Sequence, residues 1–271
     1  MSKLFFISIF ILFSSSLYSQ NINGKIVDSL NVAIPYTNIG VMDQNVGTVS
    51  DENGNFSLNL MNLNPDFKIM ISNIGYKTKK YSIEDFINVI NSKKQIVLEE
   101  KYYNLEEVTI YSKGLKSHIL GNKTTSSLIE AGFKNNSLGS EVGIKIKIKH
   151  KPTYIDSFNF FITSSKYDSL FFRLNIYSIK NNMPYQNLLS KNIFFSTDIK
   201  KGKVSIDLSK YNIIIYQDVI ITIEYVKELG KGGLNFSGGL FGNKLYHRQT
   251  SFSEWKKTGT VSLGFNVNVR Y

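Results

Sequence analysis

Nucleophilic catalysis by a serine or threonine needs a histidine beside the hydroxyl and an acid that orients the imidazole ring. The chain has three histidines, His118, His150 and His247, and none of them lies in a nucleophile-elbow motif. They are far apart, no HExxH pattern occurs, and there is no cysteine, so no zinc-ligand spacing is present. His150 follows a run of alternating lysines and should face solvent. We expect no catalytic residue, no metal site and no cofactor.

Acidic residues suggest two other kinds of site. The segment 51–54 (DENG) resembles the start of a calcium loop, but the twelfth position, which needs a bidentate glutamate, is Asn62. A tight turn with Gly54 at positive φ explains this segment better. Glycoside hydrolysis needs two paired carboxylates. No spacing selects a pair among the acids of the second half, which include Asp156, Asp168, Asp207, Glu224 and Glu254. A secreted hydrolase would need such a pair, and it is kept as the second alternative function.

Residues 230–242 are rich in glycine, and an aromatic group with one arginine follows them. We interpret 230–242 as a loop; it lacks the GK[ST] ending of a phosphate-binding loop. The candidate ligand-binding residues are Tyr246, Arg248, Phe252 and Trp255. Such side chains can stack on sugar rings or anchor a protein partner. The simpler interpretation is that these aromatics plug one end of a β-sandwich.

The charge is distributed unevenly along the chain. The whole chain carries a formal net charge of +11, and residues 115–271 hold 22 lysines and arginines against 10 acids. This excess predicts an anionic neighbour, such as an acidic glycan, lipopolysaccharide or a membrane surface, or an envelope protein. Export argues against nucleic acid as the partner. The alternative is that many of these lysines only protect the edges of sheets from pairing with other chains.

The N-terminus has the pattern of a Sec signal peptide. Lys3 precedes a ten-residue apolar run, Leu4 to Phe13, and small polar residues follow it. The run is shorter than the roughly 20 residues that a membrane-spanning helix needs. We expect cleavage after Ser19, with an uncleaved anchor as the alternative. The protein is therefore predicted to be exported to the periplasm, the outer membrane or the cell surface.

The segment from Ile22 to Glu100 reads as short strands separated by turns, with one helix. Ser82 is the expected N-cap of that helix, with Asp85 three residues later. Ile83, Phe86, Ile87 and Ile90 have the spacing of one apolar helix face. The expected strands are 24–28, 33–41, 47–50, 55–60, 67–72, 76–81 and 95–99.

An ordered set of motifs in this segment resembles the carboxypeptidase-like regulatory domain of exported Bacteroidetes proteins. The motifs are GKIVD (24–28), IPYTNI (34–39), GTVSDENGNF (47–56), ISNIGY (71–76) and LEEVTI (105–110). The resemblance implies a seven-stranded, transthyretin-like Greek-key sandwich without catalytic residues. Such domains often precede large outer-membrane receptor barrels. Here about 160 residues follow, by a count along the chain, which are too few for a barrel of that size.

The fold class is therefore all-β: a Greek-key sandwich followed by a second β-sandwich or jelly-roll-like domain. We divide the chain into a signal peptide (1–19), a regulatory-like domain (20–112) and a basic β-sandwich domain (113–271), which we assign to no named family. Residues 103–113 are a further strand or linker, and 115–140 are a long loop or an irregular entry to the second domain. Lysines 145, 147 and 149 alternate with isoleucines, which predicts a strand with one charged face. Further strands are expected at 154–163, 169–179, 192–196, 203–208, 219–226 and 261–271.

The last strand allows a different architecture. Phe265, Val267, Val269 and Tyr271 alternate with polar residues and end the chain on an aromatic, as in outer-membrane barrels. The first alternative is therefore a small eight-stranded membrane barrel with an N-terminal periplasmic sandwich. The interpretation that we prefer is a non-enzymatic, exported cell-envelope module that binds a partner or has a structural role.

Overall fold

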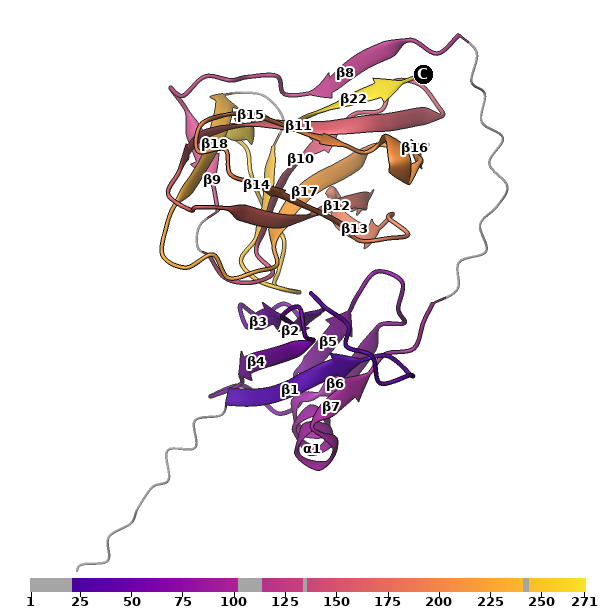
Figure 1. Cartoon of the computed structure of the whole chain (residues 1–271), viewed down its shortest axis with the longest axis vertical. Helices are drawn as coiled ribbons and strands as arrows, with labels where there is room; N and C mark the ends of the chain where they lie inside the picture. The colour runs from indigo at the N-terminus through magenta and orange to yellow at the C-terminus, as the bar shows by residue number, and fades with distance from the viewer. Residues whose placement is uncertain (1–20, 102–113, 134–135, 241–243) are drawn as a thin grey trace, which may run out of the picture.

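The computed structural model describes residues 21–101, 114–133, 136–240 and 244–271. The expected signal peptide and the segment 103–113 lie outside these residues. The described chain forms two bodies of β-strands, a smaller N-terminal one and a larger C-terminal one (Figure 1). Strands make up 51% of the structure and helix 6%, which confirms the all-β prediction.

The N-terminal body is a sandwich of two sheets. One sheet has the strand order β4-β1-β7, in which β1 is antiparallel to β4 and parallel to β7. The other has the order β3-β2-β5-β6 and is antiparallel throughout. The bounds are β1 Asn21–Val27, β2 Asn38–Val41, β3 Gly47–Val49, β4 Asn55–Asn59, β5 Lys68–Ser72, β6 Lys79–Ser82 and β7 Gln95–Val97. Seven strands agree with the predicted sandwich.

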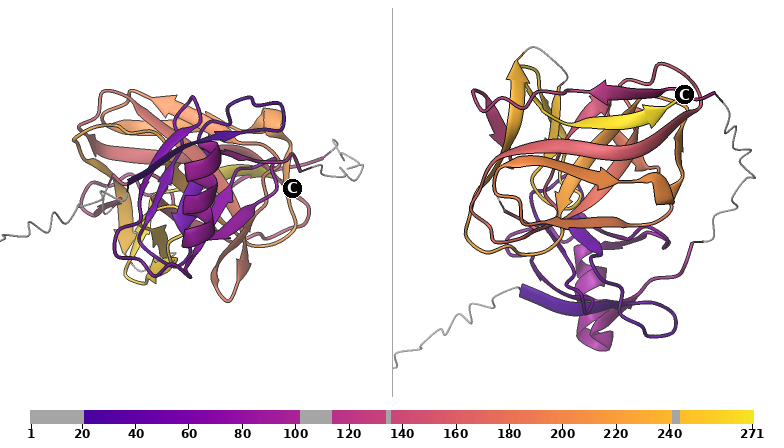
Figure 2. Two further views of the ribbon diagram at one scale, coloured as in Figure 1. Left: turned by 90° about the horizontal axis from the view of Figure 1, so that it is seen from below. Right: turned by 45° about the horizontal axis from the view of Figure 1, so that its top comes forward.

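Helix α1 (Ile83–Lys93) lies between β6 and β7 and begins where the sequence predicts. The Ser82 side chain accepts a hydrogen bond from the backbone N–H of Asp85 at 3.0 Å, which satisfies one free donor of the first turn. Ile83, Phe86 and Ile90 are buried against the strands. The helix lies on the side of this body that faces away from the second body (Figures 1 and 2).

Two expected strands of the N-terminal body begin later than predicted. The strand expected from Ala33 starts only at Asn38, because Pro35 has no N–H for a ladder and Tyr36 has a left-handed φ of 53°. The strand expected from Tyr76 starts at Lys79, and Tyr76 makes only an isolated bridge to Glu100.

The C-terminal body is also made of two sheets. The first has the order β13-β12-β17-β10-β19-β20, with β14 beside β12. The second has the order β21-β18-β11-β22-β8, with β15 and β16 beside β11 and β9 beside β18. The bounds in the first sheet are β10 Glu141–Ile146, β12 Leu170–Lys180, β13 Met183–Asn187, β14 Ile193–Thr197, β17 Val219–Tyr225, β19 Leu245–Arg248 and β20 Lys256–Thr258. Those in the second are β8 Ser117–Gly121, β9 Glu130–Gly132, β11 Thr153–Ser165, β15 Gly202–Asp207, β16 Ile213–Ile215, β18 Leu234–Leu240, β21 Val261–Leu263 and β22 Asn266–Arg270.

The core of this body lies between its two sheets. Phe158, Phe160, Phe236 and Phe265 form edge-on and tilted ring pairs there, with centroids 5.3 to 5.8 Å apart. Phe265, Val267 and Val269, which a membrane strand would turn toward lipid, instead point into this core and are fully buried, and Tyr271 packs against the core half-buried. In the described part of the chain, no helix has the length and apolar character needed to cross a bilayer.

Several predictions for the second half were wrong. Residues 115–140 are not a single loop, because β8 and β9 lie within them. Much of the glycine-rich segment is strand β18, which pairs with β11, β9 and β21. Glycines at 238 and 239 suit a crowded strand with neighbours on both sides, since they have no side chain to place. The last expected strand is divided into β21 and β22, which lie in different parts of their sheet.

Candidate functional site

Four charged residues lie in a line across one face of the first sheet of the C-terminal body. Arg173 in β12 is directly opposite Glu224 in β17, Glu224 is opposite Glu141 in β10, and Glu141 is opposite Arg248 in β19. Directly opposite residues of neighbouring strands point to the same face. We call Arg173, Glu224, Glu141 and Arg248 the charged row. All four side chains are buried, with 8% or less of each side chain exposed.

Arg173 and Glu224 connect the two bodies. The Nε atom of Arg173 lies 2.9 Å from Oε2 of Glu224, and its Nη1 donates to the backbone oxygen of Tyr36 at 2.8 Å. Its Nη2 donates to the side-chain oxygen of Asn38 in β2, whose amide in turn donates to Oε1 of Glu224. With Asn192 as a further acceptor, all three nitrogens of Arg173 have partners. This end of the row is therefore closed by the N-terminal body.

Glu141 and Arg248 form the other half of the row. Glu141 accepts hydrogen bonds from Nη2 of Arg248, from the hydroxyl of Tyr177 at 3.1 Å and from Thr222. The amide of Asn175 donates to both carboxylates, at 3.2 Å to Glu141 and 2.8 Å to Glu224. One side chain therefore bridges two neighbouring buried acids, and all four carboxylate oxygens have donors.

The pKa values of the two acids are shifted in opposite directions. Burial raises the pKa of Glu141, because Arg248 only partly offsets the loss of water and the Glu224 charge adds to it. Burial also disfavours the charge on Glu224, but Arg173, Arg248 and the amides of Asn175 and Asn38 outweigh it and lower its pKa. The row is thus two guanidinium groups compensated by two carboxylates, and all four side chains are largely withdrawn from water.

A cleft of about 580 Å³ opens beside the charged row, between the two bodies. Its walls include β2 and β5 of the N-terminal body and β12, β13 and β19 of the C-terminal body. We call it the interdomain cleft. Its polar lining residues include Asn38, Asp43, Asn73, Arg173, Asn175, Asn187, Glu224 and Arg248, and its aromatic ones Tyr177, Tyr185, Phe252 and Trp255.

Three of the four predicted ligand-binding residues meet in this cleft. The guanidinium carbon of Arg248 lies 4.9 Å from the ring centroid of Trp255 and 5.8 Å from that of Phe252, within cation–π range. Trp255 and Phe252 are half-buried. Tyr246 does not line the cleft: its side chain is buried behind it in a small cluster with Tyr177 and Ile220, against which Trp255 packs.

Sequence reasoning missed most of the charged row. Glu224 was one of several acids that no spacing could pair, and Glu141, Arg173, Asn38 and Asn175 were not singled out. The alternating pattern of a strand shows which residues share a face, but the register between strands is a long-range property. A buried charge within an otherwise apolar strand, such as Glu224 in the run 219–226, was the one local signal available.

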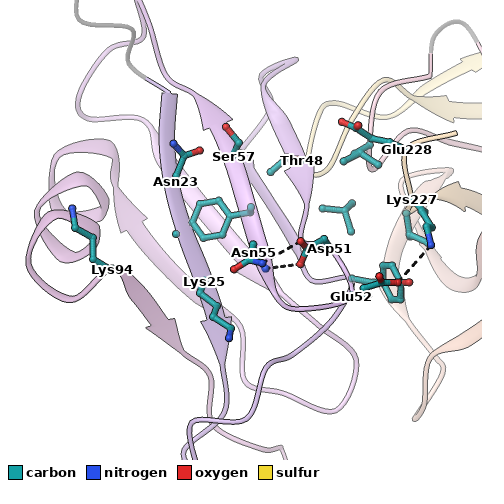
Figure 3. A pocket seen from close by; sticks show the side chains of 16 residues that line it. Asn23, Lys25, Thr48, Asp51, Glu52, Asn55, Ser57, Lys94, Lys227 and Glu228 are labelled. Atoms are coloured by element: carbon teal, nitrogen blue, oxygen red, sulfur yellow. Dashed lines mark hydrogen bonds and ion pairs between the residues drawn. The ribbon is translucent and has the colours of Figure 1, made fainter. Parts of the chain in front are cut away.

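A second cavity, of about 750 Å³, lies on another side of the contact between the bodies. Figure 3 shows Lys227 and Glu228 of the C-terminal body beside Asp51, Glu52 and Asn55 of the N-terminal body. Asp51 bonds to Asn55, and Glu52 lies 3.5 Å from Lys227. Oδ1 of Asp51 also accepts the backbone N–H groups of residues 53 and 55, as the predicted turn requires. The charges of this cavity are exposed, and nothing comparable to the charged row lines it.

The histidines are separate from both cavities. His118 and His150 both stack on the ring of Tyr271, with centroids 4.3 and 4.5 Å away, and His150 is exposed as predicted. Within the described ranges, no three His, Asp or Glu residues come together in a way that would hold a metal ion.

Comparison with known proteins adds one assignment. Residues 22–110 match the model of the CarboxypepD_reg-like domain family. No curated protein matches the chain. The match includes all seven strands of the N-terminal sandwich and α1, and it ends before β8 of the C-terminal body. The N-terminal part of this chain, residues 22–110, is therefore a CarboxypepD_reg-like domain.

Proposed function

We propose that the protein is an exported, non-enzymatic module of the cell envelope that binds a glycan in the interdomain cleft. The observation that supports this most directly is the position of Trp255 and Phe252 beside the buried Arg248 at the edge of that cleft. The regulatory-like domain is in general a non-catalytic β-sandwich. The predicted signal peptide supports export.

The cleft offers the groups that bind sugars. Aromatic rings provide flat apolar surfaces for the faces of a pyranose, and planar amide, carboxylate and guanidinium groups provide hydrogen bonds for its hydroxyls. Trp255 packs edge-on against Tyr177 at 5.7 Å, which holds its ring in place. Tyr185, with 53% of its surface exposed, adds a further ring at the rim.

Arg248 differs from Arg173 in its free hydrogen-bonding capacity. A guanidinium has five N–H donors. Among the described residues, Arg248 bonds only to Glu141, through Nη2, and its Nε has no partner. Its Nε is buried, so the donors that a ligand acceptor in the cleft, such as a sugar hydroxyl or carboxylate, could reach are those of Nη1. The lysine excess of residues 115–271 would attract an acidic glycan, or an acidic envelope protein or membrane surface, at long range.

The two neighbouring carboxylates are the observation that favours a second candidate, a secreted glycoside hydrolase. Both Glu141 and Glu224 accept from the same amide nitrogen, so they are close enough to be considered as a pair. However, each of their oxygens already has a donor, and both side chains are fully buried. A general acid or base needs an oxygen that faces the substrate or a water molecule. We therefore prefer binding to hydrolysis.

A glycan-array screen of the full-length mature protein tests this proposal. We expect binding to one class of glycan, and Trp255→Ala should weaken it by about fivefold or more, since a stacked ring contributes about 1 kcal/mol or more. Tyr216→Ala is the matched control, because Tyr216 is 55% exposed and does not line the cleft. Equal binding by the parent and Trp255→Ala would refute the cleft as the site. Release of reducing sugar from a bound glycan would instead support the hydrolase.

A further inference from the structure

The segment that carries the cleft aromatics rests directly on the N-terminal domain. The backbone oxygen of Ser251 lies so close to Gly40 in β2 and Gly47 in β3 that a Cβ atom at these positions would be 2.2 and 2.6 Å from it. Ser251 Oγ donates to the backbone oxygen of Thr48 at 2.8 Å, and the N–H of Asp43 donates to the backbone oxygen of Phe252 at 3.0 Å. Glycine at 40 and 47 is therefore required for this approach.

The same segment has a conformation that its own sequence does not favour. Phe252 has a φ of 60°, in the left-handed region, where a bulky residue loses about 1–2 kcal/mol. The hydroxyl of Ser253 accepts from the N–H groups of Gln249 and Thr250, which makes the turn tight. Such a conformation persists only where surrounding contacts impose it. The contacts with β2, β3 and Asp43 supply that constraint.

The rest of the contact between the bodies keeps β2 and β3 in place. Tyr36 packs against Phe171 and Phe194, with centroids 5.2 and 5.0 Å away. Arg173 reaches across to the backbone oxygen of Tyr36 and to Asn38. The amide of Asn192 donates to Asn73 at 2.7 Å. This combination of half-buried rings and polar bonds that are buried or partly buried is typical of a fixed interface, rather than of two domains on a flexible linker.

We propose that the CarboxypepD_reg-like domain is the positioning part of the binding cleft, and that Gly40 is a positioning residue. Through β2 and β3 it fixes residues 249–255, and with them the rings of Phe252 and Trp255. The domain is thus part of the recognition site and not a spacer. The consequence for ligand affinity rests on the proposed function, but the effect on Trp255 does not.

Trp255 is the only tryptophan of the chain, so its fluorescence reports on this segment directly. Gly40→Ala places a Cβ against the oxygen of Ser251 and must displace residues 249–255. We expect a red shift of the emission maximum and stronger quenching by acrylamide. Gly233→Ala is the matched control, because its Cβ would have no neighbour within 4 Å. Emission and quenching identical to the parent in a folded Gly40→Ala protein would overturn the proposal.

A milder variant covers the case in which Gly40→Ala does not fold, as judged by circular dichroism. Ser251→Ala removes only the hydrogen bond to Thr48 and should shift Trp255 in the same direction by a smaller amount. An unshifted Ser251→Ala would then overturn the proposal.

Glycan affinity, measured in the same proteins, separates this inference from the proposed function. If the parent binds no glycan but Gly40→Ala shifts Trp255, positioning stands and the glycan function fails. If the parent binds and the shifted Gly40→Ala loses affinity, both are supported. If the parent binds and Gly40→Ala changes neither affinity nor emission, positioning fails and the function stands.

Discussion

At the scale of single residues, the charged row is the feature that sets this protein apart from an ordinary apolar sandwich. Burying four charges is costly, and their mutual attraction repays that cost only when every donor and acceptor is well placed. Here one amide, Asn175, bridges the two acids, and the amide of Asn38 from the other domain donates a hydrogen bond to the second oxygen of Glu224. We infer that the row specifies how the two domains meet, in addition to any contribution to stability.

Removing one charge of the row should be far more harmful than removing one of an exposed pair. Glu224→Gln leaves the buried Arg173 without its counter-ion, and we expect a loss of about 3–5 kcal/mol in the free energy of unfolding. Glu99→Gln is the control, because Glu99 and Lys77 form an exposed pair at 3.0 Å, whose contribution to stability solvent largely screens. Urea denaturation measures both. Equal losses would contradict this account of the row.

The pH dependence of stability provides a further test of the Glu224→Gln variant. The pKa of Glu224 is lowered from 4.5 in the folded protein, so the unfolded chain takes up the proton first as the pH falls. The stability that ionised Glu224 provides is fully present above pH 4.5 and is lost as the pH falls through the lowered pKa. The difference between the parent and Glu224→Gln should therefore shrink in acid. A difference that is constant with pH would show that the Glu224 charge is not its origin.

At the scale of secondary structure elements, local signals predicted best. The cap of α1 was identified from Ser82 and Asp85 because capping depends on residues three positions apart. Strand β18 was missed because its glycines have low strand propensity, and its three partner strands are far away in the sequence. The late start of β2 follows from Pro35 and the left-handed Tyr36, which an apolar pattern does not reveal.

The N-cap of α1 predicts how a single serine contributes to the stability of the helix. Ser82→Ala leaves the N–H of Asp85 without its acceptor and should destabilise the protein by about 1 kcal/mol. Ser92→Ala, near the other end of the same helix, should be neutral or slightly stabilising, because alanine has the higher helix propensity. Thermal unfolding of both variants compares them within one element. A smaller loss for Ser82→Ala than for Ser92→Ala would rule out the capping role.

At the scale of the whole molecule, the sequence predicted the class of each domain but not their contact. The motifs of residues 22–110 pointed to the sandwich that the structure contains. The cleft depends on pairs such as Asn38 and Glu224, which are 186 positions apart, and no local pattern can connect them. Arg248, Phe252 and Trp255 were singled out because aromatics beside an arginine are conspicuous in sequence. Arg173 was not, because a single arginine in an apolar strand reveals no partner.

A fluorescence titration of the full-length mature protein with the glycan selected on the array tests the central claim most directly. Since Trp255 is the only tryptophan and lines the interdomain cleft, a ligand bound there must change its emission. We predict a saturable change in Trp255 emission whose dissociation constant equals that from calorimetry of the same solution. Calorimetric binding with no change in Trp255 emission would place the ligand elsewhere and contradict the account.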